Sequence, residues 1–171
     1  MPTPTIRETV EQLLRKSRIS KPPVPVERIA EHQGLEIRLA PYEGDLSGAL
    51  VRTERETFIG VNSNHHPNRQ RFTVAHELAH FLLHRGLRLH VDKKIWVNWR
   101  DDESSKAVRW EEIEANQFAA ELLMPTGFLI RDINRLGRID ASTVQFLARK
   151  YRVSPQAMDI RLNKLDASVY R

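Results

Sequence analysis

Cysteine is absent from the 171 residues of this chain, and its absence limits how the protein can hold a metal. Without thiols the chain forms no disulfide and offers no thiolate ligand, so a metal would have to be bound by histidine, aspartate or glutamate. The sequence also lacks any apolar run close to the ~20 residues that a membrane-spanning helix needs. Its first residues do not combine a basic region with an apolar stretch, as a secretory signal does. We therefore expect a soluble protein without membrane contact, located in the cytoplasm.

Positive charge is concentrated in the last quarter of the chain. Residues 130–171 contain nine Lys and Arg against four Asp and Glu, whereas residues 1–129 contain 18 of each sign. A basic surface of this kind could contact nucleic acid or an acidic partner, although many such biases are only solvated surface. Any such contact is expected in the C-terminal region.

The segment His76-Glu77-Leu78-Ala79-His80 matches the pattern H-E-x-x-H. Histidines four residues apart on a helix lie about 40° apart around its axis, so both imidazoles can converge on one metal ion. Pro67 suits the first turn of such a helix, and Gly86 can cap its end. On a helical wheel the apolar residues cover one face, while the histidines and Glu77 cover the other. The pattern therefore predicts a metal-binding helix.

The remaining patterns predict an α+β fold. Thr5 and Glu8 can form a capping box for a first helix that ends near Ser17, and a short helix follows at residues 26–33. Residues 35–39, 46–52 and 57–61 are strand candidates for a small, mostly antiparallel sheet packed beside the H-E-x-x-H helix. An exposed edge of that sheet could hold an extended peptide near the metal. Residues 87–97 could add a strand or hairpin, and residues 101–105 are expected to form a polar loop.

A second strong helix is predicted from Glu111 to Leu123, and it contains the candidates for a third metal ligand. Two histidines and one glutamate bind zinc in tetrahedral geometry and leave one position for water. Glu114 lies at the edge of the helix face that is expected to be buried, so we select it. Glu111 is a turn earlier and Glu112 is expected to face outward, which makes both weaker candidates. This ligand set suits Zn²⁺ first, with Mn²⁺ and Fe²⁺ as alternatives.

Together these residues resemble the ImmA/IrrE family of metallopeptidases. The similarity rests on residues 46–48, 59–62, 71–80 and 114–125, and it extends over roughly residues 25–128. It implies a zincin-like domain in which His76 and His80 bind zinc, Glu114 is the third ligand and Glu77 is the catalytic base. It also implies a substrate, a helix-turn-helix repressor whose site-specific cleavage releases transcription. Settings for such proteins include mobile elements, stress responses and toxin–antitoxin pairs.

The resemblance leaves the orientation of the ligand histidines unexplained. Many zinc peptidases with a glutamate ligand have an acidic residue four positions after it, where this chain has Phe118. Whatever orients His76 or His80 must therefore come from elsewhere. His84, one turn beyond His80 on the same face, could stabilise an oxyanion or support a ligand.

The C-terminal residues 129–171 are predicted to form a small, basic, helical region that resembles a helix-turn-helix, separate from a metallopeptidase domain at residues 1–128. Asp140 can cap its first helix, and Ser154-Pro155 can start its second. The side chains that could face DNA are Arg149, Lys150, Arg152, Arg161 and Lys164. The turn lacks the usual glycine, so docking to a repressor or simple packing is the preferred interpretation.

Zinc-dependent hydrolysis of a peptide bond is the main hypothesis for the function. One alternative is a DNA-binding regulator in which the metal motif is structural or vestigial, and it predicts salt-dependent binding to duplex DNA. Another is a toxin or antitoxin that acts by binding its partner without cutting it. Cleavage of a neighbouring helix-turn-helix protein would separate these hypotheses.

Overall fold

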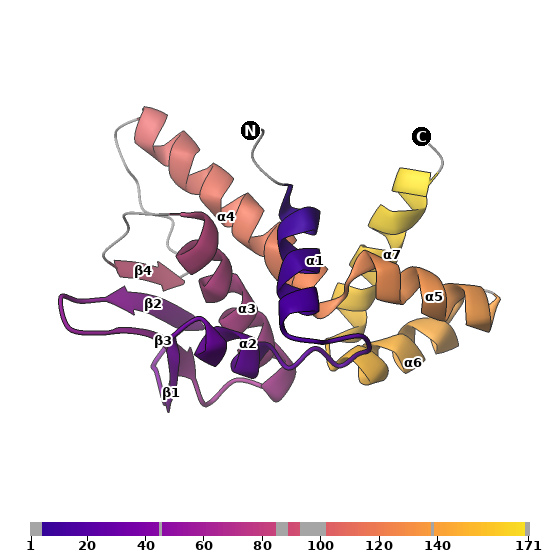
Figure 1. The fold of residues 1–171 in the computed structure, drawn as a ribbon, viewed down its shortest axis with the longest axis horizontal. Coiled ribbons are helices and arrows are strands. Elements are labelled where there is room, and N and C mark those ends of the chain that lie inside the picture. The colour runs from indigo at the N-terminus through magenta and orange to yellow at the C-terminus, as the bar shows by residue number, and fades with distance from the viewer. Residues whose placement is uncertain (1–4, 45, 85–88, 93–101, 138, 170–171) are drawn as a thin grey trace. The chain divides into compact units, whose positions relative to one another are not determined.

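The computed structural model describes residues 5–44, 46–84, 89–92, 102–137 and 139–169. These residues form helices and one four-stranded sheet, which confirms the predicted α+β class (Figure 1). The chain divides into two compact units. One unit, Val26–Ala119, contains the sheet, and the other combines Met1–Pro25 with Ala120–Arg171. None of the helices described is long and apolar enough to cross a membrane.

The sheet contains β1 (Glu36–Ala40), β2 (Gly48–Arg52), β3 (Thr57–Asn62) and β4 (Leu89–Asp92) in the order β1-β3-β2-β4. Only the pairing of β1 with β3 is parallel, whereas β2 runs antiparallel to both β3 and β4. The prediction of a small, mostly antiparallel sheet is therefore confirmed. A short helix, α2 (Val26–His32), precedes β1 and contributes buried residues at Val26, Ile29 and Ala30.

The helix that carries the H-E-x-x-H pattern is α3 (Pro67–Leu83), and it packs on β2 and β3. Pro67 occupies the first turn, as predicted, because a residue there needs no backbone N–H donor. The His66 side chain caps the helix by accepting a hydrogen bond from the Asn68 backbone N–H at 3.1 Å. The helix ends at Leu83, and the predicted cap Gly86 lies outside the described residues.

Gly48 lies where β2 packs against α3. A Cβ atom at this position would lie 2.4 Å from Thr73 Cγ2 and 2.5 Å from the carbonyl oxygen of Gly60. The Gly60 oxygen belongs to the backbone of the neighbouring strand, so it cannot move without disturbing the sheet. Glycine is therefore required here by close approach of another backbone.

We expect Gly48→Ala to lower the free energy of unfolding by about 1–3 kcal/mol, because the added methyl group overpacks the contact between sheet and helix. Denaturant unfolding measures this change. Gly127→Ala is the control, since a Cβ atom there would meet nothing within 4 Å. Equal stability of the two variants would show that the contact at Gly48 relaxes at no cost.

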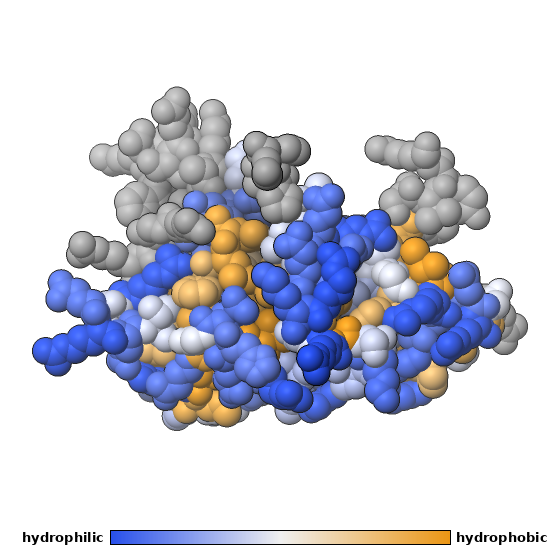
Figure 2. Space-filling view, viewed as in Figure 1, coloured by the Kyte–Doolittle hydropathy of each residue, from blue (hydrophilic) through white to orange (hydrophobic). Residues whose placement is uncertain are grey.

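The helical unit contains α1 (Ile6–Lys16), α5 (Thr126–Leu136), α6 (Ala141–Tyr151) and α7 (Pro155–Val169). The capping box of α1 is confirmed: the Thr5 N–H donates to Glu8 Oε2 at 2.7 Å, and the Glu8 N–H donates to Thr5 Oγ1 at 3.2 Å. Val10, Leu13 and Leu14 form its buried stripe. Figure 2 shows its outward face as hydrophilic, in agreement with exposure of Arg7, Glu8, Glu11, Gln12, Arg15 and Lys16.

This division of the chain differs from the predicted boundary at residue 128. The N-terminal segment belongs to the same unit as the C-terminal helices, and Arg131 Nη2 of α5 donates to the Ser20 carbonyl at 2.9 Å. The apolar pattern of a single helix cannot predict this grouping. An amphipathic helix needs a partner for its apolar stripe, but its sequence does not specify which one.

Ion pairs with buried carboxylates join the helices of this unit. Asp132 of α5 accepts hydrogen bonds from Tyr151 Oη at 2.8 Å and from Lys150 Nζ at 2.6 Å. Burial, together with the bond to Asp132, raises the pKa of Tyr151. The Arg161 guanidinium pairs with the buried Glu121 carboxylate. Two of the five basic residues predicted to face DNA are therefore engaged inside the unit.

Candidate metal centre

His76 and His80 lie one turn apart on α3 and face the same point. Both side chains are buried, and their Nε2 atoms are 3.1 Å apart. Residues on either side along the helix, such as Ala75 and Ala79, are fully buried in the core. The packing of the apolar face on the sheet thus fixes the direction of the opposite, ligand-bearing face.

A carboxylate close to both histidines belongs to Glu112 on α4 (Asp102–Leu123). Its Oε2 atom lies 3.4 Å from His76 Nε2, and its Oε1 atom lies 3.2 Å from His80 Nε2. His76, His80 and Glu112 are a group whose ligand atoms all lie within 4.8 Å of one another.

These residues fit a zinc ion in both chemistry and spacing. Two imidazole nitrogens and one carboxylate oxygen are a donor set that zinc prefers. Two ligands that are each ~2.1 Å from a zinc ion and separated by the tetrahedral angle lie roughly 3.4 Å apart. The separations of 3.1 to 3.4 Å among the three donor groups match that value. The group therefore has the donor set and the spacing to hold one metal ion.

Glu114, the glutamate selected from the sequence, lies elsewhere. Its Oε2 atom is 3.1 Å from His84 Nε2, and about half of its side chain is exposed. The expectation that Glu112 faces outward is wrong, and helix geometry explains why. At ~100° per residue Glu112 lies about 160° from Glu114 around the axis, between the positions of the buried residues Ala119 and Leu123. Glu114 as third ligand stays a prediction.

Glu77, between the two histidines in sequence, is fully buried. Charged side chains are almost never buried to this degree unless they have partners or a function. A glutamate beside two metal-ligating histidines is the position that the H-E-x-x-H pattern assigns to a general base. The structure thus places a carboxylate on the helix that carries both histidines, in a site sheltered from bulk solvent.

Two supporting residues were not predicted from the sequence. Asn116 Oδ1, one turn beyond Glu112 on α4, is 3.2 Å from His76 Nδ1. Arg52 at the end of β2 donates to the backbone carbonyl oxygens at the end of α3: His80 at 3.3 Å, Phe81 at 3.1 Å and His84 at 3.4 Å. The last carbonyl groups of a helix have no partner within it, so Arg52 satisfies them from the sheet. Asn116 lies in the segment 114–125 that resembles the family and four residues after Glu112, whereas no local pattern pointed to Arg52.

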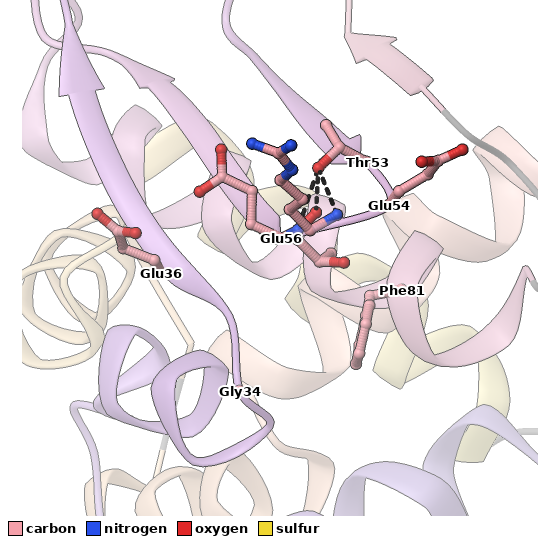
Figure 3. Close-up of a pocket in the computed structure, with 8 residues that line it drawn as sticks. Gly34, Glu36, Thr53, Glu54, Glu56 and Phe81 are labelled. Carbon is pink, nitrogen blue, oxygen red and sulfur yellow. Dashed lines mark hydrogen bonds between the residues drawn. The ribbon is translucent and has the colours of Figure 1, made fainter.

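A polar pocket lies apart from the histidine group, at the turn between β2 and β3. Its lining includes Glu36, Glu54 and Glu56, together with Phe81 of α3 (Figure 3). Hydrogen bonds from the Arg38 guanidinium lower the pKa of Glu36 and of Glu56. These exposed carboxylates are therefore neutralised in part by Arg38. No residue of the metal-binding group lines this pocket.

Known proteins resemble this chain in sequence and in fold. Residues 30–163 match the model of the Peptidase_M78 family, the IrrE N-terminal-like domain. The chain is 27% identical over 124 residues to the uncharacterized immunity region protein 2 of Bacillus phage phi105, and the match covers 72% of this chain and 71% of that protein. The fold resembles that of a Mycobacterium tuberculosis transcriptional regulator, with a TM-score of 0.58 and 14% sequence identity. That match covers 90% of this chain but only 44% of the regulator, and it concerns the fold alone.

The match to the family model covers most of the chain, including both helices of the metal-binding group. The phage protein shares similarity over most of its own length as well. The chain therefore belongs to the Peptidase_M78 family, as a metallopeptidase of the ImmA/IrrE type.

Proposed function

We propose that this protein is a zinc-dependent endopeptidase that cleaves a helix-turn-helix transcriptional repressor at a specific site. The observation that carries the proposal is the convergence of His76, His80 and Glu112 within 4.8 Å in a member of a peptidase family. The proposed ligands are His76 and His80 Nε2 with one oxygen of Glu112. Glu114, predicted from the sequence, is the competing third ligand.

Each residue has a defined part in the proposed reaction. A bound zinc ion supplies Lewis-acid polarisation of the scissile carbonyl and makes water more acidic. The Glu77 carboxylate accepts a proton from the attacking water and then returns it to the nitrogen of the leaving amine. Burial of Glu77 excludes competing solvent from this proton transfer. Asn116 holds the ring of His76 through Nδ1, so that Nε2 faces the metal position.

The proposed substrate is supported by the names of two proteins that resemble this chain. One relative is named as an immunity region protein, and one structural neighbour is titled a transcriptional regulator. Direct DNA binding by this chain has less support, because Lys150 and Arg161 are held by Asp132 and Glu121 within the helical unit. A repressor in the cytoplasm is therefore the proposed target, and its cleavage would relieve repression in a phage-like or stress-response setting.

Co-expression with a candidate helix-turn-helix repressor tests the proposal. We expect a defined fragment of that protein, which is lost when a zinc chelator is added to the purified proteins and restored when zinc is returned. A partner that stays intact and bound would instead favour the toxin–antitoxin hypothesis. Salt-dependent binding of the chain to duplex DNA, without cleavage, would favour the DNA-binding hypothesis.

A further inference from the structure

We infer that β1 is an interaction surface for a second copy of this chain, through antiparallel pairing of the two β1 strands about Ile37. β1 lies at one edge of the sheet, and β3 is the strand that pairs with it among the residues that the structure describes (Figure 1). The inference goes beyond the proposed function and does not depend on it.

The outer edge of β1 presents backbone hydrogen-bonding groups at alternate residues. The Ser63 N–H, just beyond β3, donates to the Ala40 carbonyl oxygen at 2.9 Å, so Ala40 directs its backbone groups toward β3. Because these groups alternate in direction along a strand, Ile37 and Leu39 direct theirs toward the outer edge. An edge of this kind is a template for pairing with another chain.

The side chains of β1 do not oppose such pairing on the face of the sheet that packs against α3. Natural edge strands often carry proline or an inward-pointing charge, which blocks association. Here Ile37 and Leu39 are instead in register with the buried residues Ile59 and Val61 of β3. Leu39 is 62% exposed, although it lies on this apolar face. A partner strand would remove this leucine from water, which is favourable.

The opposite face of β1 carries complementary charges two residues apart. Arg38 Nη2 donates to Glu36 Oε2 at 2.8 Å and to Glu56 Oε2 at 2.5 Å, and its guanidinium lies 4.0 Å from the centre of the Phe58 ring. One cation is therefore shared by two carboxylates, and the Glu36 side chain is 63% exposed. A strand that bears both an accessible acid and a base is complementary to itself, which favours a second copy as the partner.

Pairing about Ile37 suits both faces at once. In this register Glu36 of each copy lies opposite Arg38 of the other, and the two Ile37 residues exchange their N–H···O bonds. Leu39 of one copy lies opposite Leu35 of the other, on the apolar face. Opposite charges directly across two strands stabilise the pair, whereas like charges destabilise it. Pairing about Arg38 would place the two guanidinium groups opposite each other, so the Ile37 register is favoured.

The absence of cysteine allows a direct test of the register. Opposite residues of a hydrogen-bonded antiparallel pair have Cα atoms ~5.5 Å apart, a distance that a disulfide bridges. We expect Ile37→Cys to form, on mild oxidation, a disulfide-linked species of twice the 19.9 kDa chain mass. Leu39→Cys should form little of it, because in this register the two residues 39 are offset by about four positions, or ~13 Å along the strands. Stronger cross-linking through Arg38→Cys than through Ile37→Cys would overturn the inference.

The mass of the unmodified chain in solution, measured by light scattering, is the second test. It should rise with concentration from that of one chain toward that of two. Leu39→Lys should hold it at one chain, because it places a charge on the inward side of the edge. The exposure of Leu39 makes failure to fold unexpected. Leu136→Lys is the matched control, since it makes the same exchange at an exposed leucine of α5 and should leave association unchanged.

The inference is overturned if the unmodified chain has the mass of one copy at every concentration, or if Leu136→Lys dissociates it as Leu39→Lys does. A chain that stays monomeric and binds an extended peptide of the repressor at β1 would assign the edge to a substrate and would also overturn it. Association and cleavage are measured separately, so failure of the proposed peptidase function leaves these outcomes unchanged.

Discussion

Glu77→Gln is expected to abolish peptide cleavage while leaving zinc binding in place. Glutamine is close in size to glutamate but cannot accept a proton from water at neutral pH, so the general base is lost while the ligand set is kept. Loss of a general base typically lowers the rate by about 10²–10⁴-fold. The cleavage rate of the repressor and the zinc content of the purified variant are the two measurements.

His80→Ala is the matched comparison, because it removes a ligand from the same turn of α3. It should lose both zinc and activity. Normal cleavage by purified Glu77→Gln protein would refute the assignment of Glu77 as the base. Loss of zinc from that variant would point instead to a role for the Glu77 carboxylate in holding the metal.

Glu112→Ala is expected to cause the largest loss of zinc affinity among the glutamate substitutions. Zinc bound by four protein ligands has an apparent binding free energy of ~10–16 kcal/mol, so one ligand accounts for ~3–4 kcal/mol, or roughly 10²–10³-fold. The carboxylate of Glu112 lies 3.2 Å and 3.4 Å from the two histidine nitrogens, which is why we expect the loss at this residue. Chelator competition measures the change.

Glu114→Ala serves as the comparison, with a smaller expected loss, because the Glu114 carboxylate contacts His84 and not His76 or His80. A greater loss for Glu114→Ala than for Glu112→Ala would show that Glu114 is the third ligand, as the sequence suggested. Both glutamates lie on α4, so general damage to the helix affects the two variants alike.

The part of the site that could be predicted from the sequence is the part defined by local geometry. The spacing of His76 and His80 fixes their relation on any helix, and α3 begins at Pro67 as its turn chemistry indicated. The strands followed from short apolar runs, although β1 and β3 pair in parallel, which no local pattern specifies. Local rules therefore gave the elements but not how they pair.

The packing of α4 against α3 could not be predicted from the sequence. Glu111, Glu112 and Glu114 are close in sequence, and only the packing of α4 decides which carboxylate meets the histidines. The start of α4 was also placed too late: residues 102–105 were expected in a polar loop, yet the helix begins at Asp102. Acidic residues and serines favour helix N-termini as well as loops, so their composition did not distinguish the two.

Arg52 stabilises the last turn of α3, which contains the proposed metal ligand His80. The last turn of a helix ordinarily frays, because its carbonyl groups exchange freely with water. In α3 the terminal carbonyl oxygens, including that of His80, are bonded to a guanidinium anchored on β2. Unwinding of this turn therefore has to break contacts with the sheet. His80 and His84 consequently belong to the same cooperative unit as the strands, and local opening alone does not release them.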